Sequence, residues 1–241
     1  MAAILYPLFT VALLWLFFRL WKLRKSSEKR LVGVLILQVV IFSLIYNNLV
    51  ISVGSLLGEG NLLQSLSLVR FLLHATFTPL LMVTAMEFAV RVEVRWVQSR
   101  LSRIVIWLAA VSLMGFGVVV EWLLTGDLGL EAFLGTLRYE HLHGFPPFPA
   151  FLTILVVTIL GVLIWRTLKW PWVLIGGIVM FVGSVIPSDL VGPVVEAGVE
   201  VLWIGSLVAT EQRLLTPDYS LSEGELESRI SQVAAGRSKK P

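Results

Sequence analysis

Cysteine is absent from the 241-residue chain, so a disulfide framework, a thiolate metal site and a cysteine nucleophile are all excluded. Charged residues are also scarce, at 15% of the chain, whereas hydrophobic residues make up 57% and the mean hydropathy is +0.87. Soluble domains of this length do not have such a composition. The balance is typical of an integral membrane protein that crosses the bilayer several times.

Motifs of several common chemistries are also missing. The sequence contains no GxSxG, no HExxH and no phosphate-binding P-loop. It has no flavin or nucleotide motif either, so no cofactor is predicted. The formal net charge is only +3, and nucleic acid is not an expected partner, because the position of the basic residues matters more than their sum.

Seven segments approach or exceed the roughly 20 apolar residues that a bilayer core of about 30 Å requires of a helix. They predict an all-α fold, a bundle of seven transmembrane helices near residues 2–21, 31–56, 66–90, 104–125, 148–165, 171–188 and 191–209. The first segment lacks the positively charged start of a cleavable signal peptide, so we interpret it as a retained span. Residues around Asp189 are expected to form a tight turn between the last two spans.

Basic residues predict the orientation of the bundle. Of the 19 lysines and arginines, 17 fall in the connections after spans 1, 3 and 5, at the end of span 1 or in the tail. Positively charged loops face the cytoplasm, which predicts an external N-terminus and a cytoplasmic C-terminus. The two exceptions are Arg70 and Arg138. Because no organelle transit peptide precedes the first span, the expected location is the cytoplasmic membrane of a bacterium.

The chain divides into a membrane domain, residues 1–215, and a cytoplasmic tail, residues 216–241. Ser222 followed by Glu225 is a capping box, and the apolar spacing after it predicts a short amphipathic helix over residues 223–234. The tail is either a solvated end or a docking segment for a cytoplasmic partner or the anionic membrane surface. The basic loops offer a similar surface to a membrane protein partner.

The third span, Leu66–Val90, carries ionisable groups that lipid would not tolerate. An ionised side chain in the middle of a bilayer costs at least about 2.5 kcal/mol. Arg70, His74 and Thr78 recur at four-residue steps, so they share one helix face, and this face is expected to look into the bundle. Pro79 is expected to kink the helix below His74.

Other polar side chains should lie at the same depth. A helix rises about 1.5 Å per residue, and the predicted orientation puts nine polar residues of four helices and one turn in the outer half of the bilayer. They are Tyr46, Asn47, Asn48, Arg70, His74, Glu121, Asp189, Glu196 and Glu200. Intramembrane ionisable residues are functional candidates by default, which indicates an outward-facing polar cavity. The alternative is that the cluster only sets the packing register of the helices.

Glu196 and Glu200 lie one turn apart and are the predicted acid/base pair. Arg70 is the basic residue at that depth, and we expect its planar guanidinium to bind one of the two carboxylates. Arg70 and His74 are expected to set the protonation of the two glutamates, so all four are predicted catalytic residues. Tyr46, Asn47, Asn48 and Asp189 are the predicted substrate-binding residues.

Glu87 and Arg91 lie four residues apart and are expected to form an ordinary pair on the surface of one helix. The small residues of the sixth span should allow neighbouring helices to approach closely. They are Gly176, Gly177, Gly183 and Ser184.

The longest connection between spans, residues 126–147, contains leucines whose spacing predicts an amphipathic helical turn on the outer membrane surface. It also contains Glu140, His141 and His143. With His74, Glu196 and Glu200 they could form a metal site of nitrogen and oxygen ligands. The spacing His-x-His alone indicates an ordinary surface loop more strongly, so no metal is predicted.

Three functions are compatible with this pattern. The leading hypothesis is a membrane-embedded acid/base enzyme that acts on an isoprenoid or another lipid, because carboxylates and a histidine can transfer protons without a cofactor. The second is a transporter or sensor of a small polar solute or ion. The third is a structural or assembly subunit of a membrane complex. Expected partners are membrane lipids and a lipophilic small molecule.

Overall fold

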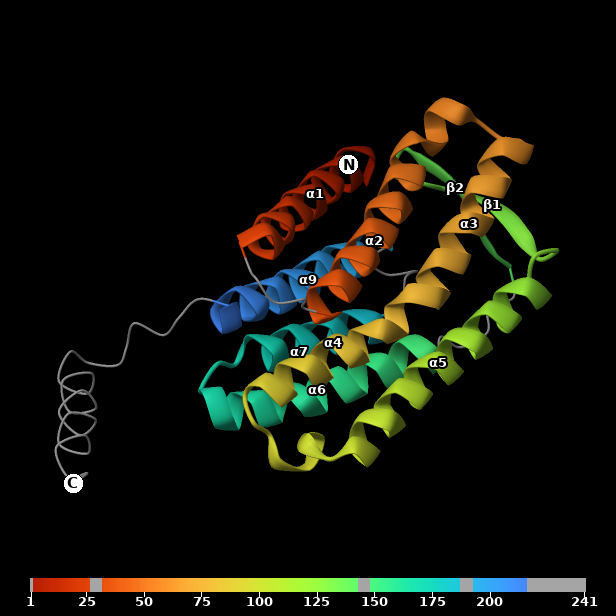
Figure 1. Cartoon of the computed structure of the whole chain (residues 1–241). Helices are drawn as coiled ribbons and strands as arrows, with labels where there is room; N and C mark the ends of the chain where they lie inside the picture. The colour runs from red at the N-terminus through yellow and green to blue at the C-terminus, as the bar shows by residue number, and fades with distance from the viewer. Residues whose placement is uncertain (1, 27–31, 143–147, 187–192, 216–241) are drawn as a thin grey trace, which may run out of the picture.

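The structure is a computed structural model, and it describes residues 2–26, 32–142, 148–186 and 193–215. This part of the chain is mostly helical, and the helices run side by side as a bundle (Figure 1). Asp189, His143 and the whole tail, with its expected helix at residues 223–234, lie outside the described residues. The expected turn between the last two spans also falls there.

Each of the seven predicted apolar segments is largely helical where the structure describes it. Within the described part of the chain, six helical stretches are long and apolar enough to cross a membrane, and α7 is a shorter apolar helix. The helices are α1 (Ala2–Ser26), α2 (Val32–Leu57), α3 (Asn61–Phe77), η1 (Thr78–Leu80), α4 (Leu81–Arg91), η2 (Arg95–Gln98), α5 (Arg100–Leu123), α6 (Phe148–Leu168), α7 (Trp172–Val185) and α9 (Pro193–Leu215).

The centre of the bundle is formed by α2 and α4. Each of these two helices gives the apolar core more buried side chains than any other helix does, and α2 packs against α1, α3 and α4. On the other side, α9 packs against α1 and α7, and α6 packs against α4 and α7. By contrast, α5 lies at the edge of the bundle and exposes large side chains such as Leu101, Trp122 and Leu123, each more than 70% exposed. Such apolar outer surfaces are compatible with an integral membrane protein.

The helical pattern of the third predicted span changes at Pro79, the position where a kink was expected. The α-helical pattern changes to the 3₁₀ turn η1 at Thr78–Leu80 and resumes as α4. Proline lacks a backbone N–H group and its ring collides with the preceding turn, which explains the change at this position. The interruption separates the polar half of the span, which contains Arg70 and His74, from the apolar half.

Close helix packing explains the glycines of α7. A Cβ atom added to Gly176 would lie 2.1 Å from Ser206 Oγ of α9, and one added to Gly177 would lie 2.3 Å from Thr158 Oγ1 of α6. Gly183 similarly faces Val199 of α9. These contacts confirm that the three glycines serve close approach of helices.

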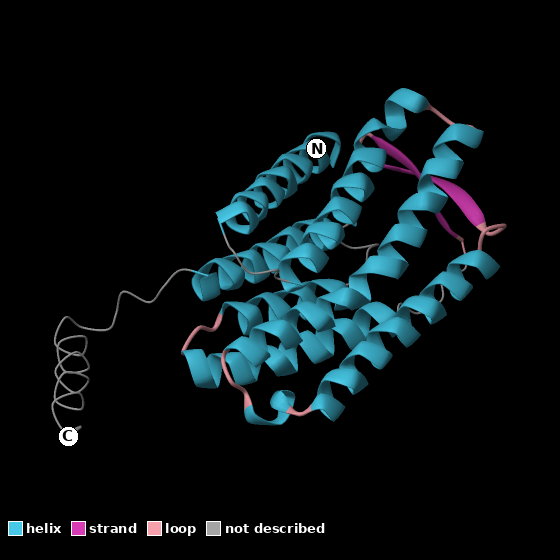
Figure 2. Cartoon of the chain, viewed as in Figure 1, coloured by secondary structure: helices cyan, strands magenta, loops and turns pink. Residues whose placement is uncertain are grey.

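The connection after α5 is a β-hairpin, so the predicted amphipathic helical turn was wrong. Strand β1 (Leu128–Phe133) pairs in antiparallel register with β2 (Thr136–His141), and Phe133 lies opposite Thr136. The two turn residues, Leu134 and Gly135, both have positive φ angles, of 44° and 88°. That conformation fits the right-handed twist of paired strands. Figure 2 shows the two strands crossing one end of an otherwise helical molecule.

Close contact with α2 and α3 holds the hairpin at this end of the bundle, called here the hairpin end. Ser55 donates a hydrogen bond of 2.7 Å to the Gly135 carbonyl oxygen. Gly54 lies so close to β2 that an added Cβ atom would be 1.8 Å from the Leu137 carbonyl oxygen. Strand residues two apart share a face, and Thr136 and Arg138 are both buried, each 3% exposed.

At the opposite end of the bundle, α4 and α9 are joined by a buried ion pair. Arg91 Nη1 donates to Glu211 Oε1 at 2.7 Å, and Arg91 Nη2 donates to Glu211 Oε2. The Glu211 side chain is fully buried. The expected pair of Arg91 with the Glu87 carboxylate was wrong, because Arg91 binds only the Glu87 carbonyl oxygen, at 3.4 Å, and turns its guanidinium toward α9.

Candidate functional site

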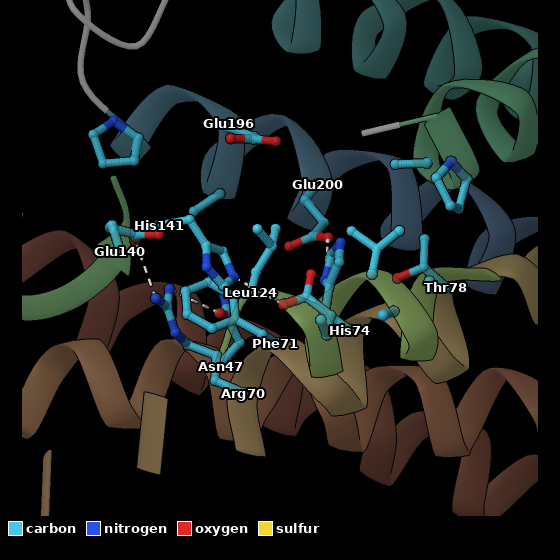
Figure 3. Close-up of a pocket in the computed structure, with 18 of the residues that line it drawn as sticks. Asn47, Arg70, Phe71, His74, Thr78, Leu124, Glu140, His141, Glu196 and Glu200 are labelled. Atoms are coloured by element: carbon cyan, nitrogen blue, oxygen red, sulfur yellow. Dashed lines mark hydrogen bonds and ion pairs between the residues drawn. The ribbon is translucent and has the colours of Figure 1, made fainter. Parts of the chain in front are cut away.

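A cavity of about 290 Å³ opens at the hairpin end. It is lined by residues of α1, α2, α3, η1, α5, β2, α6 and α9. The predicted catalytic residues Arg70, His74, Glu196 and Glu200 all line it, as does Asn47. Figure 3 shows the side chains of α3 and α9 facing each other across this space.

Arg70 lies on α3 and is 6% exposed. Its Nη2 donates to Glu140 Oε1 at 3.0 Å and to the Tyr139 carbonyl oxygen at 2.9 Å, and its Nη1 reaches Asn47 Oδ1 at 3.5 Å. The expected ion pair with Glu196 or Glu200 was therefore wrong. The hairpin, which the sequence did not predict, supplies the carboxylate instead.

Arg138 brings a second guanidinium into the cavity wall. Its Nε lies 2.8 Å from Glu140 Oε1, the same oxygen atom that Arg70 binds, and its Nη2 donates to Glu131 Oε2 at 2.8 Å. Glu131 lies directly opposite Arg138 in the hairpin, and a cross-strand pair of this kind stabilises a sheet. Glu140 therefore contacts both guanidinium groups, that of Arg70 on α3 and that of Arg138 on its own strand.

His74 and Glu200 form the deeper part of the site. His74 lies one turn beyond Arg70 on α3, and its Nδ1 is 3.9 Å from Glu200 Oε1. Glu200 is 8% exposed, whereas Glu196, one turn nearer the start of α9, is exposed. An imidazole and a buried carboxyl group at this separation are the groups that general acid–base catalysis requires.

His141 does not take part in a metal site with these residues. Its Nε2 lies 2.8 Å from Glu121 Oε2, and its ring packs on Phe71 with the centroids 4.4 Å apart. Across the described ranges, which leave out His143, no group of three histidine or carboxylate residues could hold a metal ion. His141 and Glu121 instead tie β2 to the end of α5.

Two predicted substrate-binding residues do not line the cavity. The Tyr46 hydroxyl donates to the Leu66 carbonyl oxygen at 3.2 Å. Asn48 is fully buried, and its Nδ2 donates to the Leu44 carbonyl oxygen of its own helix at 2.9 Å. Both side chains serve α2 and its contact with α3. Asn47 is the member of this trio that reaches the cavity.

Sequence reasoning assigned neither Tyr6 nor Arg138 to the site and offered Glu140 only as a possible metal ligand, yet all three residues line the cavity. Tyr6 lies on α1 and is 1% exposed. The basic residue Arg138 on the outer side was one of two exceptions to the charge pattern, and this was a usable signal. Nothing in the sequence spacing places Tyr6 beside the start of α9.

Apart from Thr78, the rest of the lining is apolar. Phe116 and Val120 of α5 form one wall with Leu124, the residue after this helix, and Ala75, Pro79 and Ala150 form another part. A polar end joined to apolar walls is the usual character of a small-molecule site, and the volume is at the lower end of the range of about 300–1,000 Å³. The shape and lining suit a lipophilic molecule with a small polar group.

The charged lining contains more acid than base. Four carboxyl groups line the cavity, those of Glu121, Glu140, Glu196 and Glu200, against the guanidinium groups of Arg70 and Arg138. Glu140 and Glu121 have the partners described above. Among the residues for which the structure gives positions, the Glu196 carboxylate has no hydrogen bond or ion pair, and Glu200 has only His74. These two glutamates are therefore free to exchange protons or bind a ligand.

No model of a known protein family matches this sequence, and no protein of curated function matches it either.

Proposed function

We propose that this chain is an integral membrane enzyme that performs acid–base chemistry on a lipid or isoprenoid in the cavity at the hairpin end. The single observation that carries the proposal is the separation of 3.9 Å between His74 Nδ1 and Glu200 Oε1 in a cavity with apolar walls. In the proposed reaction the Glu200 carboxyl group gives a proton to the substrate and His74 removes another. Isomerisation or cyclisation of a double bond needs only these two transfers.

Glu196 and Asn47 have supporting roles in this proposal. Glu196 stands nearer the start of α9, where it exchanges protons between Glu200 and the exterior. Asn47 and Arg70 meet at 3.5 Å and hold the polar end of the cavity together. Arg70 acts as a positioning residue here, because its partners are on the hairpin.

Seven membrane crossings are part of the proposal. Pro149 near the start of α6 and Pro193 at the start of α9 both line the cavity, so both helices begin at the hairpin end. The chain must therefore return between them, and α7, which packs against both, lies on that return path. Its 14 residues extend about 21 Å, less than the roughly 30 Å of a bilayer core. Together with the basic residues, this supports an external hairpin end and a cytoplasmic Glu211 end. The bacterial cytoplasmic membrane is the location we propose.

The test is conversion of a lipid extract by the purified protein in lipid nanodiscs, followed by mass spectrometry. The Glu200→Gln variant keeps the shape of the side chain but removes its titratable proton. We expect it to lose at least about 99% of the conversion, because a general acid contributes roughly 10²–10⁴-fold to the rate. Glu59→Gln is the matched control, since Glu59 is exposed in the turn between α2 and α3 and does not line the cavity. Conversion that survives Glu200→Gln would contradict the proposed chemistry.

The acid surplus favours a second candidate function, the binding and transport of a cation. In that case Glu196 and Glu200 would bind the ion and His74 would sense its presence. Uptake of a labelled cation into vesicles, lost in Glu200→Gln without any lipid conversion by the native chain, would support transport over catalysis.

A further inference from the structure

Three buried donor groups of the cavity wall have no partner. The Tyr6 hydroxyl, Arg138 Nη1 and Arg70 Nε make no hydrogen bond with any residue that the structure describes. The three side chains are 1%, 3% and 6% exposed, and all three line the cavity. A buried donor without an acceptor is unfavourable, so this wall is complete only when an acceptor binds there.

The donors come from separate elements and meet at one place. Tyr6 is on α1, Arg70 on α3 and Arg138 on β2. The Tyr6 hydroxyl lies within electrostatic reach of both guanidinium groups and of the carboxylates of Glu140 and Glu196. The first turns of α1 and α9 are also joined in a small apolar cluster that contains Tyr6 and Ala197. Tyr6 is thus held between the hairpin and the helix that carries both glutamates.

The charges of the two guanidinium groups are already balanced. Arg70 and Arg138 contribute two positive charges, and Glu140 and Glu131 are paired with them through the contacts of 2.8–3.0 Å described above. An anionic head group would add a negative charge beside Glu140 and Glu196. A cationic head group would face two guanidinium groups whose free N–H bonds need an acceptor.

We propose that the cavity binds a lipophilic molecule whose polar end is an uncharged oxygen acceptor, such as a hydroxyl, ester or ketone oxygen. This inference rests on the proposed lipid site and names its substrate class. Tyr6, Arg138 and Arg70 hold the oxygen, and the hydrocarbon part lies along Phe116, Val120 and Leu124. Glu200 and His74 then face the part of the molecule next to the oxygen.

Three photoreactive probes test the proposal. They share one hydrocarbon chain with a diazirine group and differ only in the head group, which is a hydroxyl, a phosphate or a primary ammonium. Each is bound to the full chain in lipid nanodiscs, cross-linked by light and located by peptide mapping. We expect the alcohol to label residues of α5 and α6 at the cavity and to compete better than the phosphate and the amine.

The Tyr6→Phe variant removes only one donor. We expect it to weaken binding of the alcohol probe about three- to tenfold, which is the effect of one neutral hydrogen bond. Tyr46→Phe is the control, because the Tyr46 hydroxyl donates to a backbone oxygen outside the cavity. The affinity of this variant for the alcohol probe should equal that of the native chain.

The outcomes separate this inference from the proposed function. Stronger labelling by the phosphate or the amine, or equal affinity in Tyr6→Phe and the native chain, would overturn the uncharged acceptor while the lipid site remained. Absence of cavity labelling by all three probes would overturn the lipid site itself, and the inference with it.

Discussion

Two arginine–glutamate clusters lie at opposite ends of the bundle and differ in how many of their polar groups have partners. At one end Arg91 and Glu211 form a closed, bidentate ion pair that joins α4 to α9. At the hairpin end Arg70 and Arg138 share one oxygen atom of Glu140, beside Glu196 and Glu200. The first cluster uses its charges to hold helices together. The second leaves donors and acids facing a cavity.

The comparison shows that buried charge alone does not identify a functional site. Removing one partner of a closed buried pair leaves an uncompensated charge and destabilises the fold strongly. A group that faces a cavity can change protonation or meet water, so its loss disturbs the fold less. Substitutions in the closed pair should therefore lower the free energy of unfolding more than substitutions at the cavity.

The largest effect is expected for Glu211→Gln. Because Arg91 would keep its charge against a neutral and fully enclosed partner, unfolding in detergent micelles should become easier by about 3–5 kcal/mol. The double variant Arg91→Met with Glu211→Leu removes both charges and should recover most of that loss. A single variant that costs less than about 1 kcal/mol would mean that this pair does not hold α4 to α9.

The next effect concerns the contact between the hairpin and α2. In Gly54→Ala the new methyl group would collide with the Leu137 carbonyl oxygen, and overpacking of this kind costs about 1–3 kcal/mol. Gly115→Ala, in a helix position with open space around it, is the control and should be neutral or stabilise by up to about 1 kcal/mol. Equal stability of the two variants would show that β2 does not rest on α2.

A smaller effect is expected where Trp170 meets α9. Trp170 Nε1 donates to Thr210 Oγ1 at 3.1 Å, and Thr210→Val removes this acceptor with little change of shape. Unfolding should become easier by about 1 kcal/mol, the usual contribution of one hydrogen bond. Thr210→Ser keeps the hydroxyl and should lose less, so equal losses in both variants would assign the effect to packing.

The smallest effect on stability is expected for Glu200→Gln. Its carboxylate has no close hydrogen bond, since the contact with His74 is 3.9 Å. The free energy of unfolding should change by less than about 0.5 kcal/mol, the range of substitutions outside tightly packed features. A loss as large as that of Glu211→Gln would make the two ends of the bundle equivalent and assign Glu200 to packing.

Much of the fold could be predicted because the bilayer imposes simple rules on sequence. Runs of about 20 apolar residues predicted the helices, and the four-residue steps of Arg70 and His74 predicted which face looks inward. The helical rise of about 1.5 Å per residue predicted that both residues lie at the same membrane depth as Glu196 and Glu200. These rules use only distance along one helix, and the structure places the four residues around one cavity.

Partners across elements could not be predicted in this way. Glu211 lies two residues beyond the predicted end of span 7, and Arg91 is 120 positions away, so spacing gave no indication that they meet. The hairpin was missed because its leucines also fit a helical period, and the positive φ angles of Leu134 and Gly135 leave only a weak signal in sequence. Arg70 was therefore assigned to the wrong carboxylate.

The central claim is that Glu200 lies in a cavity that opens on the side opposite the basic connections. Since the chain contains no cysteine, a single one can be introduced as a reporter. In right-side-out vesicles, the Glu200→Cys variant should react with a membrane-impermeant thiol reagent added outside, and the alcohol probe should protect it. Thr84→Cys, at a fully buried core position, should stay unreacted. A Glu200→Cys variant that reacts only from the inside, or not at all, would contradict the claim.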